Sequence, residues 1–154
     1  MVPHTQIAVV GAGECDSQVS QLAEEVGEEI GKRGFRLVCG GLGGVMEAAC
    51  RGAQRAGGLT VAILPSYDRG TANPWVDIVI PTGFGHGRNV IVVASADVVI
   101  ALPGEHGTAS EIALALALRR QVVALGAWTD YPEIVHARSP REAVERASRL
   151  ALAG

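Results

Sequence analysis

Short apolar runs recur along the chain and are separated by longer amphipathic stretches. The clearest runs are four or five residues long, carry little charge and are each followed by glycine or proline; they lie at 6–10, 36–39, 60–64, 76–80, 98–102 and 121–125. Continuous apolar character is typical of strands covered on both faces. The pattern therefore predicts strands of a mostly parallel sheet, with a short edge strand added at 133–136.

The stretches between these runs have helical spacing. After the first run, Val19, Val26 and Ile30 share one helical face, and glutamates occupy the other. A Ser139-x-x-Glu142 capping box starts the last helix. The first predicted helix follows Cys15–Ser17, is about sixteen residues long and is ended by Gly31 and Gly34; the others cover 45–56, 88–94, 111–120 and 139–152. Strands that alternate with helices predict an α/β fold, a single doubly wound, mostly parallel Rossmann-like sheet with helices on both faces, as one domain over 1–154.

Glycine-rich turns follow four of the predicted strands. They are Gly11–Gly13, Gly40–Gly44, Gly83–Gly87 and Gly104–Gly107. The carboxyl ends of parallel strands meet at one edge of the sheet, and ligands of such folds bind there, near the switch in strand order. We therefore expect the four turns to converge on one ligand site.

The stretch from 98 to 111 is the centre of that prediction. Thr108 stands three residues before Glu111, the spacing of a capping box, which predicts a helix beginning there. Unpaired amides and the positive end of the helix dipole suit an anion. Glu111 then has two interpretations, a capping residue or a ligand contact. His86 and His106 lie on loop tips at the same edge, as exposed histidines or ligand contacts.

Arg88 opens the fourth predicted helix. A positive charge at a helix start opposes the dipole, so Arg88 indicates a ligand or an acidic partner. The body of this helix, Val90–Ala94, is apolar all round, which predicts burial within the subunit or against another copy. We therefore expect a homo-oligomer, a dimer or tetramer.

Composition excludes several classes of function. The chain has 154 residues, a net charge of −3 and 4% aromatic residues, which argues against a nucleic-acid partner. No apolar run reaches the roughly 18 residues of a membrane span. Met1–Gln6 has no signal-peptide pattern, so we expect a cytoplasmic protein without a membrane partner. Three cysteines without metal spacing predict reduced thiols and no metal site.

Three motifs resemble the LOG-type Rossmann superfamily. They are Gly40-Gly41-Leu42-Gly43-Gly44-Val45-Met46, then Arg88, then Pro103-Gly104-Glu105-His106-Gly107-Thr108-x-x-Glu111. This superfamily includes the LONELY GUY cytokinin-activating phosphoribohydrolases, proteins labelled lysine decarboxylases, and the molybdenum-cofactor carrier proteins. The segments GVMEAACRGAQRAGG, TGFGHGRN and SADVVIALPG are most similar to the small branch that contains the carriers.

The resemblance implies a set of site residues. Arg88 and Glu111 take the catalytic roles of the hydrolases, which act at the N-glycosidic bond of a nucleoside 5′-monophosphate. The residues expected to bind the phosphate or the rest of the ligand are Gly11, Gly13, Gly40, Gly41, Gly43, Gly44, Gly104, Glu105, His106, Gly107 and Thr108. Two residues depart from the hydrolase pattern, since Glu105 replaces a glycine and Asn89 replaces a lysine.

Two functions follow from the resemblance and its departures. The first is a binding or carrier protein for a nucleotide-like or phosphorylated pterin ligand, which the departures favour. The second is a phosphoribohydrolase, which the pair Arg88 and Glu111 favours. No resident cofactor is required; molybdenum cofactor or a nucleotide is the implied ligand. A pyridoxal-phosphate decarboxylase is rejected, because the one lysine, Lys32, lies away from every glycine turn.

Overall fold

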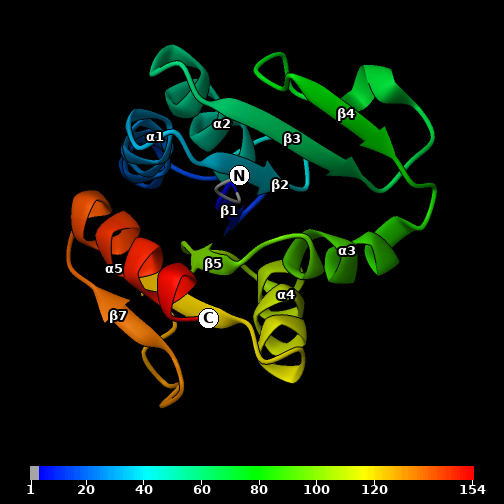
Figure 1. Ribbon diagram of the computed structural model, residues 1–154. Coiled ribbons are helices and arrows are strands. Elements are labelled where there is room, and N and C mark those ends of the chain that lie inside the picture. Colours follow the sequence, from blue (N-terminus) through cyan, green and yellow to red (C-terminus); the bar gives the residue numbers. More distant parts are fainter. Residues whose placement is uncertain (1–3) are drawn as a thin grey trace.

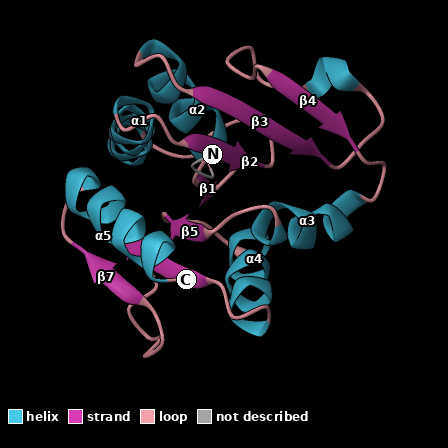
Figure 2. Ribbon diagram, in the orientation of Figure 1, coloured by secondary structure: helices cyan, strands magenta, loops and turns pink. Residues whose placement is uncertain are grey.

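The computed structural model describes residues 4–154. The segment Met1–Gln6, which has no signal-peptide pattern, begins with Met1–Pro3, and these three lie outside the described residues. The fold is an α/β Rossmann-like sheet with helices on both faces, as the sequence predicts (Figures 1 and 2). Its strands are β1 (Gln6–Val10), β2 (Arg36–Cys39), β3 (Leu59–Leu64), β4 (Ile78–Pro81), β5 (Val98–Ala101), β6 (Gln121–Leu125) and β7 (Val135–Ala137). The helices are α1 (Ser17–Lys32), α2 (Val45–Arg55), α3 (Arg88–Ala94), α4 (His106–Ala117) and α5 (Pro140–Ala153), with short 3-10 turns at Arg69–Thr71 and Gly85–Gly87.

The seven strands lie in the order β4-β3-β2-β1-β5-β6-β7, and every described pairing is parallel. From β1 the chain moves outward through β2, β3 and β4, then returns to place β5 on the other side of β1. The direction of winding therefore switches between β1 and β5. A crevice at the carboxyl ends of these two strands is where such a fold offers room for a ligand.

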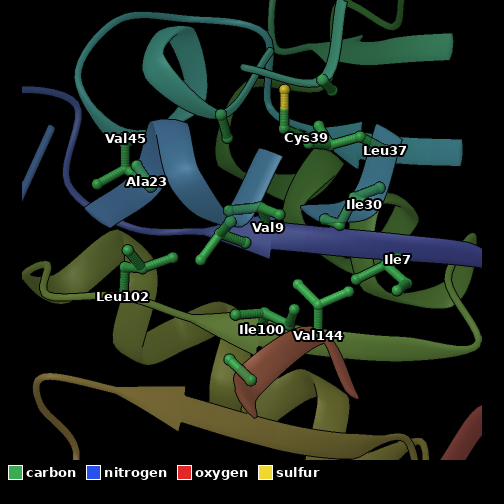
Figure 3. Close-up of a cluster of buried hydrophobic side chains, with 14 of the residues drawn as sticks. Ile7, Val9, Ala23, Ile30, Leu37, Cys39, Val45, Ile100, Leu102 and Val144 are labelled. Atoms are coloured by element: carbon green, nitrogen blue, oxygen red, sulfur yellow. The ribbon is translucent and has the colours of Figure 1, made fainter. Parts of the chain in front are cut away.

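Alternation along the central strand divides the core into two layers. Ile7 and Val9 pack with α1, α2 and α5, and Figure 3 shows them beside Ile30 and Val144. Ala8 and Val10 face the opposite layer, formed by α3 and α4. Because both faces of β1 are buried, its sequence is continuously apolar rather than alternating.

Some element boundaries differ from the prediction. The fourth strand begins at Ile78 rather than at 76, because the Asp77 carboxylate accepts hydrogen bonds from the backbone N–H of Thr60 (2.9 Å) and its hydroxyl (3.1 Å) before the ladder starts. The edge strand is Val135–Ala137, within a residue or two of the prediction. The last helix begins as predicted, with Ser139 Oγ accepting from the Glu142 N–H at 3.1 Å.

The prediction that the body of α3 is buried all round is wrong within this chain. Val92 and Val93 are buried against the sheet, whereas Val90 and Ala94 are exposed. The reason is that α3 packs on the sheet along one side and beside α4 along another, while Val90 and Ala94 face away from both. Within residues 4–154, no helix has both the length and the apolar character needed to cross a bilayer.

Candidate functional site

A cavity of about 620 Å³ opens at the carboxyl ends of the central strands. Its walls come from the loops after β1, β2 and β5, from the amino-terminal turns of α2, α3 and α4, and from the segments that follow β3 and β4. This is the edge on which the sequence predicts that the glycine turns converge. The cavity therefore occupies the switch point of the sheet.

Backbone hydrogen bonds hold three of these loops together. The Ala12 N–H donates to the Pro103 carbonyl at 3.0 Å, which joins the loop after β1 to the loop after β5. The Val45 N–H donates to the Ala12 carbonyl at 2.9 Å, which joins the same loop to the start of α2. The cavity wall is thus a connected unit of backbone rather than three independent turns.

The helix that begins in this wall starts earlier than its sequence indicates. Glu105 occupies the N-cap position of α4 and His106 is its first residue, so Thr108 and Glu111 do not form the predicted capping box. Gly104 packs closely against this first turn, because a Cβ at its position would lie 2.1 Å from Thr108 Oγ1. The turn after β5 is therefore tight enough to bring Thr108 inside the first helical turn. Three residues apart on one helix, Thr108 and Glu111 share a face.

That face is turned into the cavity and is buried. Thr108 is 3% exposed and Glu111 is 7% exposed, and both line the cavity. Neither side chain has a hydrogen-bond or ion-pair partner among residues 4–154. Burial raises the pKa of the Glu111 carboxyl to about 7, and the charge of Arg88 offsets part of this rise. The two side chains line the cavity, and neither is among the fully buried polar groups without a partner in the described residues, so their polar atoms are available to a ligand there.

Arg88 reaches the cavity from the first residue of α3. Its Nε donates to the Ile63 carbonyl at 3.0 Å, and Nη2 lies 3.5 Å from the Gly40 carbonyl. A Cβ on Gly40 would lie 2.5 Å from Nη2, so glycine is required for this approach. The sequence indicates a ligand or an acidic partner for Arg88. The nearby acidic side chain is Glu111, whose charge acts on Arg88 at longer range, because the two do not form an ion pair within 4.0 Å. Arg88 is instead oriented by carbonyls at the ends of two strands.

Asn89 links Arg88 to the start of α4. Its Oδ1 accepts from Arg88 Nη1, and its Nδ2 donates to Ser110 Oγ at 2.9 Å. Ser110 in turn donates to the Gly107 carbonyl at 2.7 Å. The residue that departs from the hydrolase pattern therefore connects α3 with the helix whose amides face the cavity.

The structure brings eight of the expected site residues together on the cavity wall. These are Gly11, Gly13, Arg88, Glu105, His106, Gly107, Thr108 and Glu111. The other five, Gly40, Gly41, Gly43, Gly44 and Gly104, lie behind the wall, where they shape its backbone. Glu105 and His106 are exposed at the mouth, and His86 joins them from the turn before α3.

Several lining residues lie outside the expected set. They are Ala12, Glu14, Leu42, Met46, Pro65, Gly85 and Asn89. Glu14 directly follows the turn Gly11–Gly13, and Pro65 directly follows β3. Their positions at the carboxyl ends of predicted strands could therefore have identified both as candidate site residues. Met46 carried no signal, because a methionine on the inner face of a helix is typical of a core.

The cysteines fit reduced thiols in the described part of the chain. Cys39 and Cys50 are buried with their Sγ atoms 3.5 Å apart, and Cys15 is half-buried. Across residues 4–154, no group of three or more histidine, cysteine, aspartate or glutamate side chains is arranged to hold a metal ion.

Comparisons with solved structures identify close relatives. The molybdenum cofactor binding protein from Rippkaea orientalis superimposes with a TM-score of 0.92 at 36% identity, covering 97% of this chain and 99% of that one. The molybdenum cofactor carrier protein of Chlamydomonas reinhardtii gives a TM-score of 0.89 at 32% identity, covering 99% of this chain and 100% of that one.

A comparison of sequences finds a more distant enzyme. The cytokinin riboside 5′-monophosphate phosphoribohydrolase of Mycobacterium tuberculosis is 35% identical over 118 residues, which are 74% of this chain and 56% of that protein. The sequence model of the SLOG cluster4 family matches residues 4–152. The chain therefore belongs to the SLOG cluster4 family, a LOG-type family near the molybdenum cofactor carriers.

Proposed function

We propose that this protein binds a phosphate-bearing small molecule in the cavity at the switch point, as a carrier of the molybdenum-cofactor type. One observation supports the proposal above the others: Thr108 and Glu111 are both more than nine-tenths buried, line the cavity and have no side-chain partner within residues 4–154. Each would regain a hydrogen bond when a ligand enters.

We propose that the amino end of α4 binds the phosphate of the ligand. The first amides of a helix have no acceptor within the helix, and those of His106, Gly107 and Thr108 belong to this group. The helix dipole places partial positive charge at the same point. We propose that these amides and the Thr108 hydroxyl hold the phosphate. Glu105 at the mouth opposes an anion that approaches too closely, by about 1 kcal/mol at 4 Å in water.

The relatives with known cargo support the same class of ligand. A molybdenum cofactor binding protein and a molybdenum cofactor carrier resemble this chain over nearly its whole length. We propose that molybdenum cofactor, or a nucleotide of similar shape, is the cargo of this protein. The cavity residues offer amides, a hydroxyl, a carboxyl and a guanidinium, which suit the phosphate and the polar edge of such a molecule.

Hydrolysis of a nucleoside 5′-monophosphate is the second candidate. It is supported by Arg88 and Glu111, which line one cavity without forming an ion pair with each other. All three side-chain nitrogens of Arg88 already donate to protein acceptors, which favours a positioning role over a catalytic one and therefore favours the carrier.

The two candidates are separated by incubating the protein with a panel of nucleoside 5′-monophosphates. Chromatography measures free base and ribose 5-phosphate, and calorimetry measures binding under the same conditions. A carrier binds without releasing base. Release of base that disappears in Glu111→Gln would contradict the carrier and support the hydrolase.

Replacing Thr108 with valine tests the phosphate position. Thr108→Val keeps the shape of the side chain and removes its hydroxyl, so we expect affinity for inorganic phosphate or a nucleoside monophosphate to fall about ten-fold or more, as for a lost bond to a charged group. Calorimetric titration measures the change. Thr71→Val, in the loop outside the cavity, is the matched control and should bind like the wild type. Unchanged affinity in Thr108→Val would contradict the phosphate position.

We further propose that the protein is a homo-oligomer that covers the outer side of α3 and α4. Val90 on α3 is 36% exposed and Leu118 at the end of α4 is 42% exposed. Light scattering is expected to give the mass of a dimer or tetramer, and Leu118→Glu is expected to reduce it. Leu152→Glu, at an 82% exposed position on α5, is the control and should leave the assembly intact. A monomeric wild type would contradict the proposal.

A further inference from the structure

Two of the three cysteines lie side by side in the core, close to the cavity. Cys39 is the last residue of β2, and Cys50 lies on α2. Both side chains are fully buried, and their Sγ atoms are 3.5 Å apart. In a disulfide the two sulfur atoms are about 2 Å apart. The sulfurs therefore need to approach each other by only about 1.5 Å to become bonded.

Cavity-lining residues adjoin this thiol pair on both sides. Met46 precedes Cys50 by one turn of α2, packs against the core cluster that contains both cysteines, and lines the cavity. Leu42, three residues after Cys39, also lines the cavity. A small neutral oxidant such as hydrogen peroxide therefore has a short path from the cavity to the sulfur atoms.

The surroundings of the pair make Cys39 the more reactive thiol. Its Sγ accepts a hydrogen bond from the Gly41 N–H at 3.3 Å. The hydrogen bond between the two thiols lowers the pKa of Cys39, as do the Gly41 N–H and the charge of Arg88, whereas burial and the charge of Glu111 oppose them. The same thiol contact and burial raise the pKa of Cys50. Because the thiolate is the form that attacks an oxidant, Cys39 reacts first and Cys50 follows.

We propose that Cys39 and Cys50 form a modification site, which hydrogen peroxide converts to a disulfide and a dithiol reductant restores. The Cys39 thiolate attacks one oxygen of the peroxide, the O–O bond breaks, and the departing hydroxide takes up the thiol proton as water. The Cys50 sulfur then attacks the sulfur of the Cys39 sulfenic acid. The S–S bond forms, the S–O bond breaks, and the hydroxide leaves with the Cys50 proton as a second water. The two thiols lose two electrons, which reduce the peroxide.

The helix side of the pair is fixed by close packing. A Cβ on Gly27 of α1 would lie 2.0 Å from the Ala49 carbonyl oxygen, and a Cβ on Gly52 of α2 would lie equally close to a carbonyl oxygen of α1. The two helices are therefore in backbone contact on either side of Cys50. The movement that closes the disulfide must come from Cys39, at the end of β2.

A shift of Cys39 reaches the cavity through the next two residues. The Gly41 N–H loses its sulfur acceptor, and the Gly40 carbonyl, which accepts from Arg88 Nη2 at 3.5 Å, moves with the end of the strand. Arg88 is then held less firmly in the cavity wall. We expect the disulfide to weaken ligand binding by about five-fold or more. This coupling rests on the proposed function, whereas formation of the disulfide does not.

Peptide mapping tests the disulfide in the wild-type protein. Trypsin releases residues 37–51 as one peptide, which holds Cys39 and Cys50, while Cys15 lies in another. After peroxide treatment and alkylation, this peptide is expected to be lighter by two hydrogen atoms and to carry no alkyl group. Dithiothreitol added before alkylation is expected to restore two alkylated cysteines. Cys50→Ala, which leaves Cys39 without its partner, is the matched control and should not give the lighter peptide.

Calorimetry with guanosine 5′-monophosphate, on reduced and oxidised Cys15→Ser protein, measures the coupling. A wild-type peptide 37–51 that keeps both thiols under peroxide that oxidises Cys15 would overturn the inference. A disulfide from Cys39 or Cys50 to Cys15 would also overturn it. A Cys39–Cys50 disulfide that leaves the affinity unchanged would overturn the coupling to the cavity. If the reduced protein binds no nucleotide, the proposed function fails, and the mass of the peptide still decides the disulfide.

Discussion

Glu111→Gln is expected to raise the free energy of unfolding by about 3 kcal/mol at pH 8 and to leave it unchanged at pH 4. Burial raises the pKa of Glu111 to about 7 from an ordinary value of 4.5, so the folded protein disfavours the ionised carboxyl. The difference between these two values corresponds to about 3 kcal/mol once the group is ionised in both states. A neutral glutamine of the same size avoids that penalty.

The sign of the pH dependence follows from the raised pKa. Below about pH 4.5 the carboxyl is protonated in the folded and unfolded chain, and it contributes no penalty. Between there and about pH 7 the unfolded chain loses its proton first, so stability falls as the pH rises. Urea unfolding at pH 4, 6 and 8 measures the gap between variant and wild type. Equal stability of the two proteins at pH 8 would contradict the buried, unpaired carboxyl.

The buried Glu111 carboxyl, which lowers stability at neutral pH, also indicates a functional site. A group that destabilises the fold at neutral pH contributes nothing to folding that a glutamine would not supply better. Strained or unpaired residues of this kind concentrate where a ligand binds or reacts. The stability gain in Glu111→Gln is therefore expected to accompany a loss of ligand affinity.

Arg88→Ala is expected to lower the free energy of unfolding by about 3 kcal/mol. The change leaves the Ile63 carbonyl, the Gly40 carbonyl and the Asn89 amide oxygen without their shared donor. It also removes the positive charge beside Glu111, which moves the pKa of that carboxyl still higher. The two effects act in the same direction at neutral pH.

Urea unfolding of two further variants separates these effects. In Arg88→Ala combined with Glu111→Gln, the electrostatic part of the loss is expected to be recovered and the part due to the unpaired acceptors to remain. Arg149→Ala, whose only described partner is the exposed Glu145 on α5, is the control and should change stability by less than about 0.5 kcal/mol. A loss in Arg88→Ala as small as in this control would show that the buried contacts of Arg88 contribute little.

The sheet and its helices could be predicted because their signals are local. In β1, a continuous apolar run followed by glycine is enough to indicate a buried parallel strand. Ser139 and Glu142 form their cap within four residues of chain, so sequence alone places the start of α5. The convergence of the glycine turns then follows from parallel topology, without knowledge of any contact.

The site was harder to predict because its contacts are not local. The Thr108 and Glu111 spacing is that of a capping box, yet the helix begins earlier, at His106, and both residues line the cavity. Arg88 finds its acceptors in Ile63 and Gly40, which lie on other strands. Such tertiary contacts override a local pattern, and nothing in the sequence near either motif marks them.

A crystal structure of the protein soaked with guanosine 5′-monophosphate tests the central claim, that the amides at the start of α4 hold a phosphate. The expected result is a phosphate within hydrogen-bond reach of the Gly107 and Thr108 amides, with the rest of the nucleotide in the cavity that Glu111 and Arg88 line. A nucleotide bound elsewhere on the molecule, with this cavity left empty, would contradict the claim.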